Sequence, residues 1–210
     1  MAVYKLFPYK DTTLYSFYPN MNTGIDSILQ ISNLNIAVDS NPQVSRFLTE
    51  FVQTEITDVI DNKIGSNTWD VNFKGSIATA GGIVESTDIA VYPIAQYWWN
   101  GTGGYLDQPL TTDGASWYTP NFSGSIAWSS SGLDTFGNSV TGSYDSSLVG
   151  QGGGSWLFES ASTSFKITQS FDTRSEKDLN IGVKTIVERW YSGSINNYGF
   201  ITKWEDSVEF

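Results

Sequence analysis

The chain of 210 residues contains no cysteine and no histidine. Without cysteine there is neither a disulfide framework nor a thiolate ligand for a metal, so packing must hold the protein together. Without histidine the Ser-His-Asp and Cys-His nucleophile systems are excluded, together with imidazole metal sites. The sequence also shows no P-loop and no Rossmann fingerprint. It therefore predicts a protein that is not an enzyme and carries no cofactor.

Long apolar runs are missing as well. No stretch approaches the roughly 18 consecutive apolar residues that a membrane span requires. The N-terminus runs from Met1 into Pro8 and Asp11 without the apolar core of a secretion signal. The sequence as written therefore predicts neither membrane insertion nor export.

Basic residues are scarce, with 11 Lys and Arg against 22 Asp and Glu and a net charge of -11. A chain of this sign repels phosphate backbones, whose binding needs clustered Lys and Arg. Nucleic acid is therefore not an expected partner, and the acidity mainly favours solubility.

The sequence does supply apolar surface for a core, with 40% hydrophobic residues that include 8 Trp, 11 Tyr and 12 Phe. Short alternating segments between Gly, Asn, Ser and Pro are typical of strands; examples are residues 26–31, 45–51 and 164–168. Residues 53–63 repeat apolar side chains at helical spacing, and residues 19–24 and 150–154 are expected to be loops. We predict one all-β domain over residues 1–210, a jelly-roll-like antiparallel β-sandwich with a few short helices.

An internal repeat relates residues 89–101 to residues 181–193, since both read I-x-V-x-x-I-x-x-x-W-x-x-G. I-x-V places two β-branched residues on one face of a strand, and Ile followed four residues later by Trp places both on one side of a helical turn. We therefore expect each copy to be a strand that runs into a short helix. The final glycines should adopt positive φ angles, and Trp98 and Trp190 should cap the core.

Aromatic residues crowd the segment around residues 97–118. Trp98 and Trp99 are neighbours, so they cannot both point into one core, and at least one should reach the surface or an interface. Trp99, Tyr105 and Trp117 are our candidates for subunit contact or for stacking on a glycan, with the periphery of the core as the third alternative.

Two sets of polar residues have alternative interpretations. Asp107 and Asp113 could form a pair of glycosidase carboxylates, or they could be turn residues that bond the nearby backbone. Asn20, Asn22 and Asp26 offer hard oxygen ligands to Ca²⁺, or they too are turn formers. We favour the turn-forming role in both sets and predict no catalytic residue and no metal site.

Blocks spread over nearly the whole chain resemble, in the same order, the DNRLRE-type domain. They are residues 10–14 (KDTTL), 19–24 (PNMNTG), Leu29, 45–48 (SRFL), Trp98 through 113–117 (DGASW), 181–183, 190–193 and 196–203. The resemblance implies a jelly-roll β-sandwich related in shape to carbohydrate-binding modules, in a family usual in surface-exposed bacterial proteins. It implies no reaction.

The cell-surface members of that family carry export signals and further modules, whereas these blocks begin almost at Met1. Such a version resembles structural proteins of tailed phages, particularly cyanophages, which are made in the host cytoplasm and released by lysis. We therefore expect a non-enzymatic virion structural protein of the tail, neck, baseplate or head decoration. Its partners would be copies of itself and other virion proteins. The alternative is a carbohydrate-binding module that recognises host-surface glycans.

Overall fold

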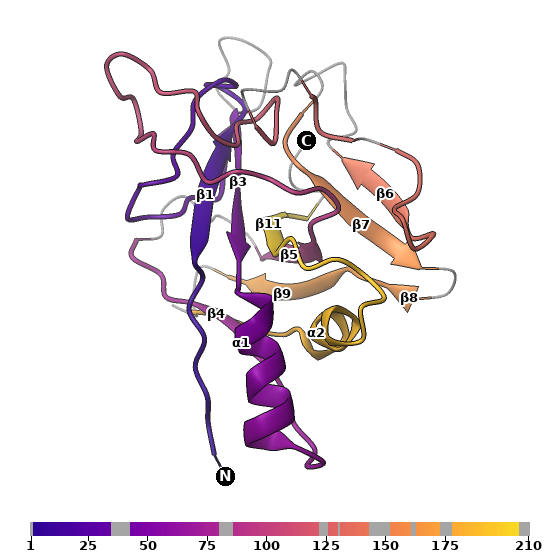
Figure 1. Ribbon diagram of the computed structural model, residues 1–210. Helices are drawn as coiled ribbons and strands as arrows, with labels where there is room; N and C mark the ends of the chain where they lie inside the picture. The colour runs from indigo at the N-terminus through magenta and orange to yellow at the C-terminus, as the bar shows by residue number, and fades with distance from the viewer. Residues whose placement is uncertain are drawn as a thin grey trace.

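The computed structural model describes residues 2–34, 43–79, 86–121, 126–129, 131–142, 152–160, 163–172 and 178–205. The elements are β1 (Lys10–Tyr15), β2 (Ser32–Leu34), β3 (Gln43–Glu50), α1 (Gln53–Asp58), η1 (Val59–Ile64), β4 (Asn72–Gly75), β5 (Thr87–Pro93), β6 (Ser139–Gly142), β7 (Ser155–Ser160), β8 (Thr163–Ser164), β9 (Ile167–Phe171), β10 (Leu179–Gly182), α2 (Lys184–Tyr191) and β11 (Phe200–Trp204). Antiparallel strands dominate and helical segments are short (Figure 1). The predicted all-β, sandwich-like fold is confirmed. In the described residues no helix has the length and apolar character of a membrane span.

A six-stranded sheet forms the centre of the protein, in the order β1-β3-β11-β5-β9, with β2 also paired to β3. Successive residues of a strand point to opposite faces. Val91 and Phe200 therefore contribute to a cluster on one face, and Tyr92 and Ile201 to a cluster on the other. Both faces of these strands are buried, and the buried set includes polar and charged side chains such as Thr12, Arg46 and Lys203 beside the apolar ones.

The first cluster lies against the helices and the β4–β10 pair. Ile56 of α1, Ile60 of η1 and Trp190 of α2 all bury their side chains in it. The helix predicted over residues 53–63 is confirmed, although it begins as an α-helix and continues as a π-helix. Gly65 follows with a φ angle of 60°, which a glycine adopts without strain.

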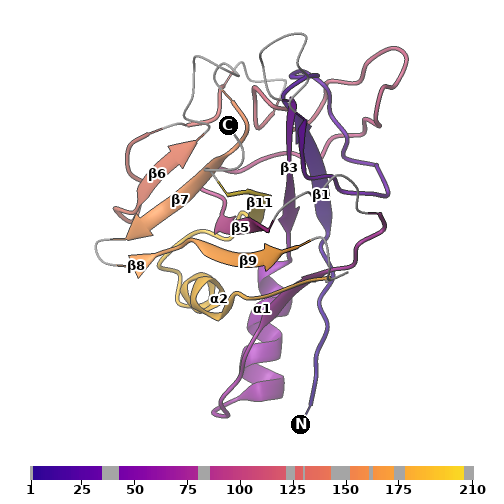
Figure 2. The same ribbon diagram turned by 180° about the vertical axis from the view of Figure 1, so that it is seen from behind.

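The second cluster lies on the opposite face and is rich in tryptophan. Trp98, Trp117, Trp128 and Trp156 are all buried in it. Trp156 comes from β7, the middle strand of the β6-β7-β8 sheet that is visible from behind in Figure 2. Large rings bury much apolar area per residue, which suits a core that has no disulfide to support it.

The strand predictions succeed in part. Residues 45–51 fall mostly in β3, and residues 164–168 are divided between β8 and β9. The strand predicted at residues 26–31 is wrong. There the backbone N–H of Ile25 donates to Gly103 and that of Asp26 to Thr23, so the chain forms a turn and then an exposed loop.

The two copies of the repeat fold differently. Residues 181–193 form β10 and then α2, as predicted, whereas residues 89–101 form β5 without a following helix. The prediction is wrong for that copy because the backbone after β5 pairs with β7 and so cannot form helical hydrogen bonds. Ile94 pairs with Trp156 there, and the N–H of Ala95 donates to the carbonyl of Ser155 at 3.0 Å.

The ends of both copies behave as predicted. Gly101 and Gly193 have φ angles of 77° and 70°. Trp98 and Trp190 are both buried, one in each hydrophobic cluster. The shared pattern therefore predicts the anchoring ring and the turn correctly, but not the helix between them.

Candidate binding surface

The outer edge of β1 is closed by side chains from two loops. The N–H of Asp11 donates to Oδ1 of Asn100 at 3.0 Å, and the N–H of Thr13 donates to the hydroxyl of Thr23 at 3.0 Å. Thr23 in turn donates to the carbonyl of Thr13 at 2.9 Å. An open strand edge invites pairing with another chain, and these side chains occupy it instead.

Asn22 joins the same two loops to each other from a fully buried position. Its amide nitrogen donates to the carbonyls of Asn100 at 2.7 Å and Ala115 at 2.9 Å. Its amide oxygen accepts from the N–H groups of Gly24 at 3.2 Å and Gly103 at 2.9 Å. Every donor and acceptor that an asparagine side chain offers is therefore used by backbone groups.

Two glycines allow this close packing of loop on loop. A Cβ atom on Gly24 would lie 2.1 Å from the carbonyl oxygen of Asn100. One on Gly101, whose φ is positive, would lie 2.3 Å from Oδ1 of Asn22. Residues of three of the blocks named above, 10–14, 19–24 and 98–117, thus meet in one network that covers the edge of β1.

The two candidate carboxylates hold loop backbone. Asp113 accepts from the N–H of Thr102 at 2.8 Å and from its hydroxyl at 2.7 Å, and these hydrogen bonds lower the pKa of the Asp113 carboxyl. Asp107 accepts from the N–H of Gly104 at 2.6 Å and from the hydroxyl of Thr111 at 3.3 Å. These are the contacts of turn-forming residues, which supports that interpretation over a glycosidase pair.

The loop oxygens considered for Ca²⁺ are engaged in a similar way. The Asn22 amide is bonded to backbone on all sides, and Asp26 accepts from the N–H of Tyr105 at 3.0 Å. Across the described ranges, no group of three or more His, Cys, Asp or Glu is placed to hold a metal ion.

Trp98 and Trp99 lie in different environments, as their adjacency predicts. Trp98 is fully buried and donates from its indole N–H to the carbonyl of Tyr198 at 2.9 Å, whereas Trp99 is 53% exposed. The backbone of Trp99 is held by two hydrogen bonds. Its N–H donates to the carbonyl of Pro120, and its carbonyl accepts from the N–H of Ala115. The exposed indole is therefore held on an anchored segment of chain.

Trp99 belongs to a patch of aromatic side chains that we call the Trp99 face: Tyr9, Tyr97 and Trp99. All three are about half exposed. The Tyr97 and Trp99 rings meet edge to face, with centroids 6.0 Å apart and an interplanar angle of 85°. Tyr9 lies near Tyr97, because the Lys10 ammonium is 5.4 Å from the Tyr9 ring centroid and 4.4 Å from the Tyr97 ring centroid, and the Tyr9 hydroxyl donates to Glu50 at 2.5 Å.

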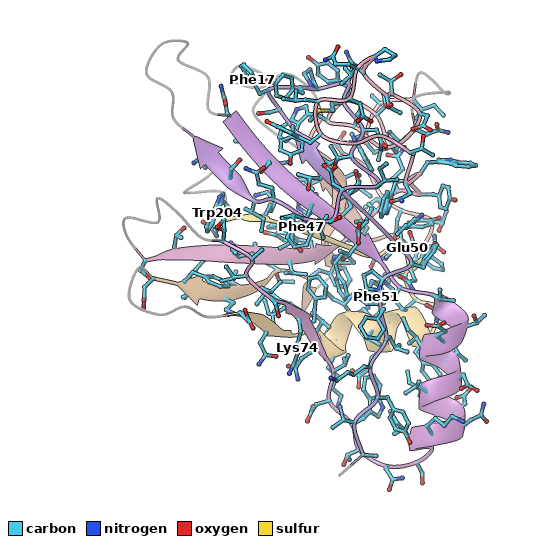
Figure 3. All side chains as sticks on the ribbon, turned by 90° about the vertical axis from the view of Figure 1, so that its left-hand side faces the viewer. Phe17, Phe47, Glu50, Phe51, Lys74 and Trp204 are labelled. Carbon is cyan, nitrogen blue, oxygen red and sulfur yellow. The ribbon has the colours of Figure 1, made fainter. Side chains whose placement is uncertain are left out.

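A buried ion pair underlies this face. The Lys10 ammonium lies 2.8 Å from a Glu50 carboxylate oxygen, and the two side chains are only 7% and 8% exposed. The ammonium also donates to the Trp98 carbonyl at 2.8 Å and lies 4.4 Å from the centroid of the Tyr97 ring. Figure 3 shows Glu50 at the end of β3, next to Phe51.

Burial sets the protonation of these groups. It lowers the pKa of Lys10, and the charge and hydrogen bond of Glu50 oppose that shift. Burial also raises the pKa of Tyr9 well above its usual value, and the hydrogen bond to Glu50 adds to the effect. The Tyr9 hydroxyl is therefore neutral at physiological pH and remains a donor.

Tyr105 lies in a different environment. Its ring packs against Tyr15 at 5.2 Å and Tyr18 at 6.1 Å between centroids, and it is 50% exposed. The two loops that meet there expose large apolar side chains that we call the Tyr105 end: Phe17, Ile25, Ile28, Tyr105, Leu106 and Leu110. Figure 3 shows Phe17 at the end of the protein away from Phe51 and the helix that follows it.

The expectation that Trp117 contacts a partner or glycan is wrong, because its side chain is fully buried. The Arg46 guanidinium lies 4.9 Å from the centroid of its ring, and its carbonyl accepts from the N–H of Gly153 at 2.6 Å. Residues 152–154 therefore form a loop, as predicted, that packs closely over this ring. Gly150 and Gln151 of the same predicted loop lie outside the described residues.

The structure thus places the three predicted contact residues in three environments and adds others that the sequence reading missed. Tyr9, Tyr97, Lys10 and Glu50 were not predicted as parts of a site. The sequence held a signal for the ion pair, because strand alternation puts Lys10 on the same face as Leu14 and Glu50 on the same face as Leu48. Their pairing across β1 and β3 is not a local pattern.

Comparisons with protein-family models, with curated proteins and with solved structures found no match for this chain.

Proposed function

We propose that this chain is a non-enzymatic structural protein of a tailed-phage virion, in the tail, neck, baseplate or head decoration. In this role it makes repeated contacts with copies of itself and with other virion proteins, and it resides in the particle. The observation that carries the proposal is the Tyr105 end, where two loops expose large aliphatic and aromatic side chains together.

The Tyr105 end is suited to protein contact because its backbone is anchored. The N–H of Ile25 donates to Gly103, that of Tyr105 to Asp26, and that of Leu106 to the sulfur of the buried Met21. Contiguous exposed apolar patches mark interaction sites in soluble proteins, and interface cores are enriched in aromatic residues. An anchored loop also loses little conformational entropy when a partner binds.

The resemblance to the DNRLRE-type domain, in the version that resembles structural proteins of tailed phages, is a second support for the proposal. Blocks that carry it, residues 19–24, Trp98 onward and 113–117, meet in the network around Asn22. These blocks therefore contribute to one structural feature, the network that closes the edge of β1.

The proposal is tested by replacing Ile25 and Tyr105 together with Asp and measuring sedimentation velocity over rising protein concentration. We expect the wild-type protein to form multimers and the double variant to stay monomeric, because buried unpaired carboxylates disfavour a contact. Leu133→Asp, at an exposed apolar residue outside the Tyr105 end, is the control and should behave as wild type. A wild-type protein that is strictly monomeric and absent from purified particles would contradict the proposal.

Recognition of host-surface glycans is the second function that we propose. The specific observation in its favour is the Trp99 face, whose exposed members are all aromatic.

A further inference from the structure

We propose that the Trp99 face binds a neutral carbohydrate, with the Trp99 indole as the surface on which a sugar ring stacks. This inference rests on the second proposed function, and it names the residues and the class of glycan. Tyr97 borders the indole and can offer its hydroxyl to the ligand, whereas the Tyr9 hydroxyl already donates to Glu50. The site does not involve the residues of the Tyr105 end.

The two surfaces differ in chemical composition, and we therefore expect them to bind different classes of ligand. The Tyr105 end mixes aromatic rings with the aliphatic side chains of Ile25 and Leu106, a composition that packs against other proteins. The large exposed apolar side chains that define the Trp99 face, Tyr9, Tyr97 and Trp99, are all aromatic. A pyranose ring presents C–H bonds with partial positive charge on one face, which complement the negative face of an indole, and hydroxyls around its rim.

Trp99 is the member of the face best suited to stacking. Tyr97 already has the Lys10 ammonium 4.4 Å from its ring centroid, and the rings of Trp99 and Tyr198 meet it at 85° and 76°. Trp99 exposes 53% of its surface and offers the largest ring. A sugar on Trp99 would therefore meet Tyr97 at its side, where the phenol hydroxyl can bond to the sugar hydroxyls.

The face is fixed before any ligand arrives. The Trp99 backbone is hydrogen-bonded to Pro120 and Ala115, and the Tyr9 hydroxyl is bonded to Glu50. Immobilising side chains on binding costs free energy, so rings already held by the fold reduce that cost. This matters for sugars, whose hydroxyls give up hydrogen bonds to water when they bind.

Charge decides which sugars fit. The Lys10 ammonium beneath the face is neutralised by Glu50 at 2.8 Å and therefore offers no free cation to an anionic ligand. The protein as a whole carries a net charge of -11. Uronic acids, sialic acids and phosphorylated glycans would be repelled, which leaves neutral hexose oligosaccharides as the favoured class.

The test is binding of the full chain to immobilised neutral oligosaccharides (cellohexaose, maltohexaose and a galactan), with polygalacturonate as the acidic comparison. We expect a neutral probe to bind and polygalacturonate to bind weakly or not at all. Trp99→Ala should weaken binding by about tenfold or more, the size expected for loss of one aromatic stacking contact together with its buried area. Phe136→Ala, at an aromatic residue that is 47% exposed and belongs to neither surface, is the matched control and should bind as wild type.

Trp99→Phe keeps a smaller ring in place and should bind with intermediate strength, which guards against a folding defect in Trp99→Ala. The inference is overturned if no neutral probe binds, if polygalacturonate binds best, or if the Trp99 variants bind as wild type. Such a result leaves the virion proposal standing, because Trp99→Ala is expected to keep the multimers that depend on the Tyr105 end. A wild-type protein that binds the sugar but forms no multimers would count against the virion proposal and leave the carbohydrate inference standing.

Discussion

The ion pair of Lys10 and Glu50 lies where charge is costly. Both side chains are almost fully buried, and the ammonium is surrounded by the Glu50 carboxylate, the Trp98 carbonyl and the rings of Tyr97 and Trp98. Removing two charges from water costs several kcal/mol per ion, which is recovered only when the pair and its hydrogen bonds are complete. The pair therefore links β1 to β3 and fixes the floor of the Trp99 face.

Lys10→Met should destabilise the protein by about 3–5 kcal/mol, because Glu50 stays buried without its ion-pair partner. Adding Glu50→Gln to that variant should recover part of the loss. The free energy of unfolding from urea titration of both single variants and the double variant measures the coupling. Lys5→Met, at an exposed lysine, is the control and should change the stability little. Strictly additive effects would show that the two groups do not interact.

Tyr15 gives the protein a predictable response to alkali. Burial is the main cause that raises the pKa of Tyr15 from 10.0 to about 12. Between these values the unfolded chain has lost the phenol proton while the folded protein keeps it, so stability is present below pH 10 and falls as the pH rises toward 12. Urea titrations below pH 10 and near pH 12 should therefore show a smaller fall for Tyr15→Phe than for wild type. Lys10 and Tyr9 also have shifted pKa values, but both proteins contain them, so they cannot cause a difference between the two. An identical fall in the free energy of unfolding would contradict the assignment to Tyr15.

β1 is protected by hydrogen bonds that come from loops instead of from another strand. Thr23 is fully buried, and its hydroxyl accepts from the N–H of Thr13 and donates to the carbonyl of Thr13. The side chain of Asn100 accepts from the N–H of Asp11. This leaves no continuous row of free backbone groups along the described edge of β1 on which another chain could add. Contacts between copies should therefore use side-chain surfaces such as the Tyr105 end, and not strand addition at β1.

Thr23→Val keeps the shape of the side chain and removes its hydroxyl. Because the N–H and carbonyl of Thr13 then lack their partner, we expect a loss of about 1–3 kcal/mol in the free energy of unfolding. Amide hydrogen exchange should become faster at Thr13 while the centre of β3 keeps its protection. Thr54→Val, at an exposed position of α1, is the control. Unchanged exchange at Thr13 would mean that the loop does not protect the edge.

Local patterns predicted the parts of this fold that depend on neighbours in sequence. Apolar spacing gave the helix at residues 53–63, and the adjacency of Trp98 and Trp99 required one buried and one exposed ring. The positive φ angles of Gly101 and Gly193 followed from their place after the repeated tryptophan. Each of these features is determined within a few residues of chain.

Features that depend on distant partners could not be predicted in the same way. The helix expected after β5 is absent because Ile94 pairs with Trp156, some sixty positions along the chain. Trp117 is buried because Arg46 and the Gly153 loop close over it. The Trp99 face also joins Tyr9 to Tyr97, which only the folded sheet brings together. The prediction of one domain over residues 1–210 stays a prediction.

The protein as it stands combines a sheet buried on both faces with two exposed surfaces of different chemistry. One surface mixes aliphatic and aromatic side chains, and the other presents three exposed aromatic side chains above a neutralised ion pair. Loops held by the Asn22 network support both surfaces. This arrangement suits a component that assembles by one surface and meets a glycan by the other.

The most direct test is quantitative mass spectrometry of purified phage particles from the source of this chain, with the major capsid protein as the internal reference. We expect the chain to be present at a fixed copy number relative to the capsid protein, and this ratio to survive further purification of the particles. Absence from particles, or a ratio that falls with each purification step, would contradict the central claim that this is a virion structural protein.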